Sequence, residues 1–158
     1  MFDTILGLPV HALVIHVVVV LVPLAALGVI GIAVVPAWRR RFGPAVLAVT
    51  TVGLVAVPVA TRSGMKLQAR IHAQGVTADQ IDRHKHMGQL VIYPTAALWV
   101  LAVLLVYLDR RARGGRAVTV VAALAVLAAA AAAVQVTITG HLGSVAVWSC
   151  TLQTSACK

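Results

Sequence analysis

The sequence predicts an all-α integral membrane protein, a four-helix bundle whose N-terminus and C-terminus both lie on the extracytoplasmic side. The composition, the lengths of four apolar stretches and the positions of the arginines predict it. Of the 158 residues, 61% are hydrophobic and 11% are charged, whereas soluble domains average about 45–50% apolar and about 25% charged residues. The excess of apolar residues indicates a lipid environment rather than an unusually large core.

Four apolar stretches have lengths that suit helices crossing a bilayer. Such a helix needs about 20 residues, within a range of about 17–25. We expect a single domain with helices at 9–35, 44–61, 87–108 and 117–139, an outward loop at 62–86 and an outward tail at 140–158. Neither an internal repeat nor a low-complexity linker is evident in the sequence. Lipid-facing loops are excluded from the spans because they would leave backbone polar groups unpaired in hydrocarbon.

The four apolar stretches differ in length and in composition. The first is long enough to tilt or to begin in the headgroup region, and the second is at the short end of the range. In the third, Pro94 should bend the helix because proline removes a backbone donor. The fourth is nearly all alanine and valine at 120–134, and such small side chains let neighbouring helices approach closely.

The short connections set the orientation. "WRRRFG" (38–43) and "DRRARGGR" (109–116) are rich in arginine, and short arginine-rich loops lie in the cytoplasm. The middle loop carries five basic residues over a longer span, which weakens this contrast without reversing it. The start of the chain lacks the basic region of a cleaved signal, so we expect the first helix to be retained in a multi-pass protein of the cell membrane.

The net charge of the chain is +9. A strongly basic balance is also typical of nucleic-acid-binding proteins. Here the basic residues fall almost entirely between the apolar stretches, where membrane topology accounts for them. We therefore expect the lipid bilayer as a partner and no nucleic acid.

Both cysteines, Cys150 and Cys157, follow the fourth helix. The tail is expected on the outward side, where an oxidising compartment favours a disulfide. Two free thiols or a metal-binding pair are the alternatives, although the tail has no C-x-x-C spacing that would favour metal.

The six histidines are absent from both arginine-rich connections. His11 and His16 open the first helix, His84 and His86 open the third, His141 follows the fourth, and His72 lies in the middle loop. An up-down topology gathers these helix ends on one face of the bundle. On the first helix, His11 and His16 are about 140° apart at about 100° per residue, so both rings cannot point to one spot.

Imidazole is a common ligand of transition metals and an axial ligand of haem iron. Gly88, Gly140 and Gly143 supply small positions near His84 and His141, where a macrocycle would need room. We expect haem b, with copper or zinc as alternatives, and with His16 and His84 as the first choice of ligands and His11 and His141 as alternates. One alternative is that no cofactor binds and the histidines only bond carbonyls or headgroups, which suits His72 and His86 best. Proton sensing or relay is the third possibility, because imidazole titrates near neutral pH.

Three segments also resemble a known family. "LPVHALVIH" (8–16), "HKHMG" (84–88) and "GHLGSVAVW" (140–148) resemble the bacterial four-helix membrane proteins catalogued as domain of unknown function 2231. The family pattern has PVHxLVxH at the start, HxxLG at the third helix and GHxGAxxVW after the fourth. By this resemblance His11, His16, His84 and His141 are the family-pattern histidines, whereas His86 is extra.

The resemblance also carries an analogy and some departures. The layout is similar to that of two-haem b-type membrane cytochromes, which is an analogy of fold. Met87 and Ser144 replace the family's leucine and alanine, and the cysteine-bearing tail is not part of the pattern. The two replacements are mild, whereas the tail leaves the partner of this chain undefined.

Together these features predict electron transfer through a histidine-bound haem b or metal ion, with a quinone or a redox protein as partner. The rival function is a non-enzymatic membrane scaffold or accessory subunit with structural histidines. We do not expect a stand-alone enzyme, since the chain has no nucleophile–base motif, and Ser63, Gly64 and Ser144 are interpreted as ordinary loop or packing residues. The sequence leaves a homo-oligomer open.

Overall fold

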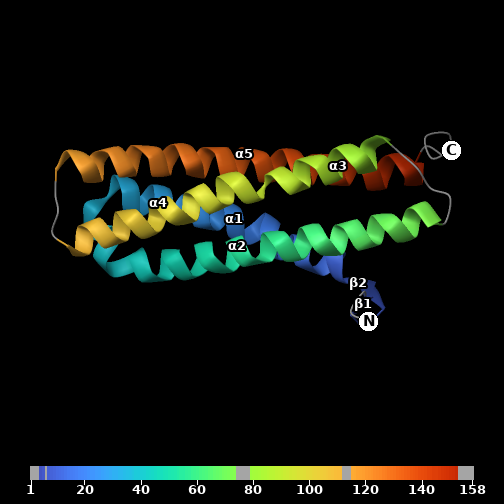
Figure 1. Ribbon diagram of the computed structural model, residues 1–158, viewed down its shortest axis with the longest axis horizontal. Helices are drawn as coiled ribbons and strands as arrows, with labels where there is room; N and C mark the ends of the chain where they lie inside the picture. Colours follow the sequence, from blue (N-terminus) through green and yellow to red (C-terminus); the bar gives the residue numbers. More distant parts are fainter. Residues whose placement is uncertain (1–3, 6, 74–78, 112–114, 153–158) are drawn as a thin grey trace.

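The computed structural model is a bundle of long helices with a small hairpin at the start of the chain (Figure 1). It describes residues 4–5, 7–73, 79–111 and 115–152. The elements are β1 (Thr4–Ile5), β2 (Leu8–Pro9), α1 (Val10–Val34), α2 (Pro36–Ala73), α3 (Asp79–Leu90), α4 (Ile92–Arg110) and α5 (Arg116–Leu152). α1, α2, α3 with α4, and α5 make four spans that are long and apolar enough to cross a membrane. The predicted all-α, four-span fold is confirmed, and the antiparallel two-residue strands only lead the chain into α1.

The helices run past the ends of the apolar stretches, so several predicted boundaries are wrong. The connection expected at 38–43 lies inside α2, which begins at Pro36, and proline suits a first helical turn because its missing N–H would have no partner there. Most of the loop expected at 62–86 is helical, and the expected tail is helical as far as Leu152. Hydropathy marks where the hydrocarbon ends, whereas a helix continues into the polar layer until a turn stops it.

The third span is interrupted at Val91, three residues before Pro94, where a bend was expected. The N–H of Val91 bonds to the carbonyl of Gly88 at 3.4 Å, and so the carbonyl of Met87 lacks its helical partner. The side chain of Gln135 in α5 donates to the Met87 carbonyl at 3.0 Å. A polar side chain of a neighbouring helix thus satisfies the backbone group that the interruption frees.

α1 and α4 lie diagonally across the bundle, and each packs against both α2 and α5. The core between them is made of small and branched side chains, such as Val22, Leu98 and Ala129, which are fully buried. Three alanines of α5 have no exposed surface: Ala125, Ala129 and Ala132. The expected role of the small residues in the fourth helix, close helix packing, is confirmed.

The positions of buried residues in the first half of the bundle recur in the second half, although the two halves do not share a sequence repeat. Adding 73 to the numbers of six buried residues of α1 (Val18, Val22, Ala25, Val29, Ile32 and Ala33) gives six buried residues (Val91, Thr95, Leu98, Ala102, Leu105 and Val106) of the α3–α4 span. Adding 79 to four buried residues of α2 (Arg39, Thr50, Gly53 and Val57) gives four buried residues (Val118, Ala129, Ala132 and Val136) of α5. The α1–α2 hairpin therefore corresponds to the second hairpin by an approximate two-fold rotation about the bundle axis.

A buried arginine holds together the end of the bundle where α1 finishes. Arg39 donates from Nε to the carbonyl of Ile32 at 2.7 Å and from Nη2 to that of Ala33 at 2.8 Å. Both carbonyls lie in the last turn of α1, where they have no helical partner. The guanidinium also lies 3.8 Å from Asp109 of α4. Arg39, expected in a loop, thus joins three helices.

Candidate functional site

All six histidines lie toward one end of the bundle, where α1 and α3 begin and α2 and α5 finish. We call it the histidine end. Its residues include His11, His16, His72, His84, His86 and His141. The opposite end, which carries Arg39, Arg40, Arg41, Arg110 and Arg111, is called the arginine end. The histidines and the arginines lie at opposite ends because successive helices run in opposite directions.

At the histidine end, the rings of His11 and His84 meet across the bundle. Their centroids are 6.2 Å apart, and their planes are inclined at 74° in an edge-to-face arrangement. Both side chains are partly buried. Because α1 and the α3–α4 span are diagonal neighbours, this contact lies near the bundle axis.

Each of these two rings is anchored to the backbone of an adjacent helix. Nδ1 of His11 donates to the carbonyl of Ala60 in α2 at 3.0 Å, and Nδ1 of His84 donates to that of Thr139 in α5 at 3.0 Å. A carbonyl oxygen only accepts hydrogen bonds, so Nδ1 carries the proton in both rings. In the neutral imidazole the lone pair is then on Nε2, and Nε2 is the atom available to a metal.

A glycine lies against each ring, one helical turn after the carbonyl that anchors it. A Cβ atom added at Gly64 would lie 2.9 Å from Cε1 of His11, and one added at Gly143 would lie 2.9 Å from Cε1 of His84. Real Cβ atoms do not approach other atoms so closely. A larger side chain at either position would therefore displace the ring that packs there.

The two sets of contacts are equivalent under the repeat. His84 follows His11 by the same 73 positions that relate the buried residues of α1 and α4, and Thr139 and Gly143 follow Ala60 and Gly64 by 79. Gly143 was expected near a histidine ligand, whereas Gly64 was interpreted as an ordinary loop or packing residue. Gly64 does not lie in a loop, because it is within α2, and it packs against the His11 ring.

The other candidate ligands lie elsewhere on the surface of the bundle. His16 is exposed, and its Nδ1 lies 2.6 Å from the carbonyl of Ala12 in its own helix. His141 of α5 is exposed, as are His72 and His86. The first-choice pair, His16 and His84, is therefore not the pair whose rings meet here.

The part of the chain that the structure describes contains no metal site with three or more protein ligands. Within these residues, no three His, Cys, Asp or Glu side chains form a group that could hold an ion. The predicted disulfide lies outside the described residues, which include neither Cys157 nor the side chain of Cys150. What the site offers is a pair of imidazoles on the axis.

One of the comparisons with known proteins identifies a family. A family model described as "Predicted membrane protein (DUF2231)" matches residues 7–156. The curated proteins and the solved structures compared with the chain gave no match. The match covers all four spans and both anchored histidines. The chain is therefore a multi-pass membrane protein that belongs to the DUF2231 family.

Proposed function

We propose that the chain binds one haem b or one transition-metal ion between His11 and His84 and uses it for electron transfer in the membrane. The observation that carries the proposal is the meeting of two imidazoles on the bundle axis, each with Nδ1 bonded to a backbone carbonyl. Ligating histidines typically donate their second ring N–H to a carbonyl or a carboxylate, which fixes the tautomer and the ring orientation.

The spacing of the rings suits a shared ligand. Two imidazole nitrogens that bind one ion from opposite sides, at about 2.0–2.1 Å each, put the ring centroids roughly 6 Å apart. The observed separation is 6.2 Å, and one ring would have to turn from the edge-to-face arrangement for both Nε2 atoms to face the ion. The rings themselves occupy the space beside Gly64 and Gly143, so a haem would need further room between the helices.

The residues of the chain would set the properties of such a centre. His11 and His84 hold ligand positions that the carbonyls of Ala60 and Thr139 keep in one orientation. The apolar spans exclude water from the bundle below the rings. Bound haem or copper would supply one-electron chemistry, whose potential depends on ligand identity, hydrogen bonding and burial.

The expected orientation places this site near the extracytoplasmic face of the cell membrane. Its support is the arginine end, since short arginine-rich segments favour the cytoplasm. A single centre at one end does not carry electrons across the whole bilayer. A membrane quinone or a redox protein on the outer side would therefore exchange electrons with it.

A non-enzymatic scaffold or accessory subunit is the second candidate. The observation in its favour is that both Nδ1 atoms are satisfied and the two rings already contact each other. Such a pair can act as a polar tie between two hairpins. In that case the histidines contribute to helix packing and bind no cofactor.

Visible spectra and elemental analysis of the purified protein distinguish the two. The chain is expressed with added haem precursor, copper or zinc and purified in detergent, together with His11→Ala, His84→Ala and the control His86→Ala. We expect one haem or ion per chain in the parent and in the control, and a loss in both other variants. A colourless and metal-free parent protein favours the scaffold.

A further inference from the structure

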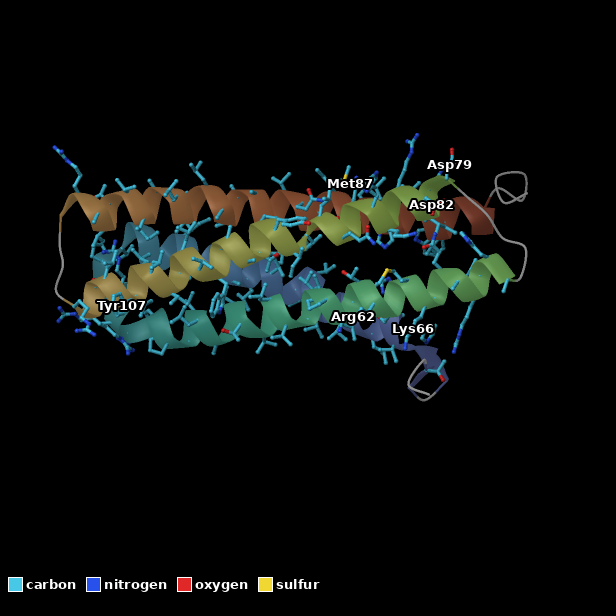
Figure 2. All side chains as sticks on the ribbon, viewed as in Figure 1. Arg62, Lys66, Asp79, Asp82, Met87 and Tyr107 are labelled. Carbon is cyan, nitrogen blue, oxygen red and sulfur yellow. The ribbon has the colours of Figure 1, made fainter. Side chains whose placement is uncertain are left out.

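A basic groove runs along the outside of the histidine end, between the start of α1 and the outer part of α2. Its volume is about 270 Å³. The walls are formed by Pro9, Val10, His11, Val59, Arg62, Ser63, Lys66, Leu67 and Arg70. Among these described residues there are three permanent cations and no acidic side chain. Figure 2 shows Arg62 and Lys66 on α2, beside the part of the chain that leads into α1.

The three cations follow one another at intervals of four residues. Arg62, Lys66 and Arg70 are one helical turn apart, so that their side chains lie in a row on one face of α2. The row presents more than one cationic side chain to a ligand in the groove.

The second half of the chain lacks this row. Adding 79 to the numbers of Arg62, Lys66 and Arg70 gives His141, Val145 and Ser149. Helix packing is repeated in the two halves, whereas the row of cations is not. The packing that the two halves share therefore does not explain the row of cations.

The groove also lies where a membrane changes from apolar to polar. The apolar part of α2 is followed by the polar segment 62–73. Below the cations, three valines of α2, Val52, Val55 and Val59, are about half exposed, at 52%, 59% and 45%. A molecule with a charged phosphate and long acyl chains matches this sequence of surfaces.

We propose that the groove binds the phosphate of an anionic phospholipid, with the headgroup between Arg62 and Lys66 and the acyl chains along the valines of α2. Arginine and lysine both form charge-assisted hydrogen bonds to phosphate. The apolar wall of Pro9, Val10 and Leu67 covers the glycerol end of the lipid. This site does not depend on a cofactor at His11 and His84.

Calorimetric titration of the delipidated full chain in a non-ionic detergent tests the proposal. The probes are dihexanoyl phosphatidylglycerol, dihexanoyl phosphatidylcholine and inorganic phosphate. The variants are Arg62→Gln with Lys66→Gln, Arg62→Gln alone, and the control Arg83→Gln with Lys85→Gln. The control removes the same charge from exposed positions of α3, and circular dichroism verifies the helix content of each variant.

We expect one phosphatidylglycerol per chain and weaker binding of phosphatidylcholine. The double groove variant should bind phosphatidylglycerol at least about tenfold more weakly, the single variant should lie between, and the control should match the parent. Equal loss in the control means a general charge effect and overturns the proposal. Binding of inorganic phosphate as tight as that of phosphatidylglycerol, or unchanged binding in the double variant, overturns it as well.

Discussion

His11 and His84 make the same two contacts in the two halves of the chain. Each ring donates from Nδ1 to a carbonyl and rests on a glycine one turn later in the same helix. The two rings then meet each other with centroids 6.2 Å apart. One structural unit, present twice, thus builds a site on the approximate two-fold axis, and its two members should contribute equally.

The glycines beneath the rings should not tolerate a methyl group. Gly64→Ala and Gly143→Ala place a Cβ 2.9 Å from a ring carbon, and such overpacking typically costs about 1–3 kcal/mol. Denaturant titration in mixed micelles measures the free energy of unfolding, and the two variants should lose similar amounts.

The matched control is Gly140→Ala in α5, where an added Cβ would meet no atom within 4 Å. This variant should be as stable as the parent or more stable, by up to about 1 kcal/mol, because alanine has the higher helix propensity. Equal destabilisation by all three substitutions would contradict the role of the ring contacts.

His16 should contribute little to the site. Its ring is exposed and bonds only within its own helix among the described contacts. His16→Ala should therefore keep the cofactor content of the parent, as measured by the haem or metal per chain, whereas His11→Ala should lose it. The reverse result would restore the ligand pair first expected from the sequence, His16 and His84.

Arg39 should stabilise the arginine end. Arg39→Gln removes two hydrogen bonds from a buried guanidinium to the carbonyls of Ile32 and Ala33, and it weakens the pairing of Asp109. We expect a loss of at least about 2 kcal/mol, since bonds from charged groups contribute about 1.5–3 kcal/mol each. Unfolding in mixed micelles measures this loss.

Arg40→Gln is the control for that measurement. Arg40 also pairs with Asp109, at 3.7 Å, but its side chain is 80% exposed. Exposed ion pairs contribute about 0–1 kcal/mol, so this variant should remain near the parent. If both variants lost equally little free energy of unfolding, the buried bonds of Arg39 would not hold the three helices together.

Orientation is testable by single cysteines in a background without Cys150 and Cys157. Ala73→Cys lies at the histidine end and Arg111→Cys at the arginine end, and both positions are exposed. A membrane-impermeant maleimide added to intact cells should label the first and spare the second, because arginine-rich segments stay in the cytoplasm. The opposite labelling would place the histidine pair at the cytoplasmic face.

The sequence predicts the number of spans and the gathering of histidines at one end, because both depend only on long apolar stretches and helix direction. It does not select His11 over His16. The first span is apolar on all sides, so no polar face reveals which side of the helix faces the axis. The choice depends on Ala60 and Gly64, which lie far along the chain.

The repeat is hidden for a similar physical reason. Burial in an apolar core requires only suitable volume and shape, so Val22 corresponds to Thr95 and Thr50 to Ala129 without identity. At the site, His11 and His84 are the same residue, and so are Gly64 and Gly143. Helix ends are missed because α2 remains helical through the polar residues after Ala60.

The most direct test of the shared histidine site is the spin state of ferric haem in the loaded protein, read from absorption and electron paramagnetic resonance spectra. The parent should be low-spin with two imidazole ligands. His11→Ala and His84→Ala should each become high-spin, and imidazole added to the buffer should restore the low-spin spectrum in both. A loaded parent protein that is high-spin, or a variant without both His11 and His84 that keeps the low-spin spectrum of the parent, would contradict the account.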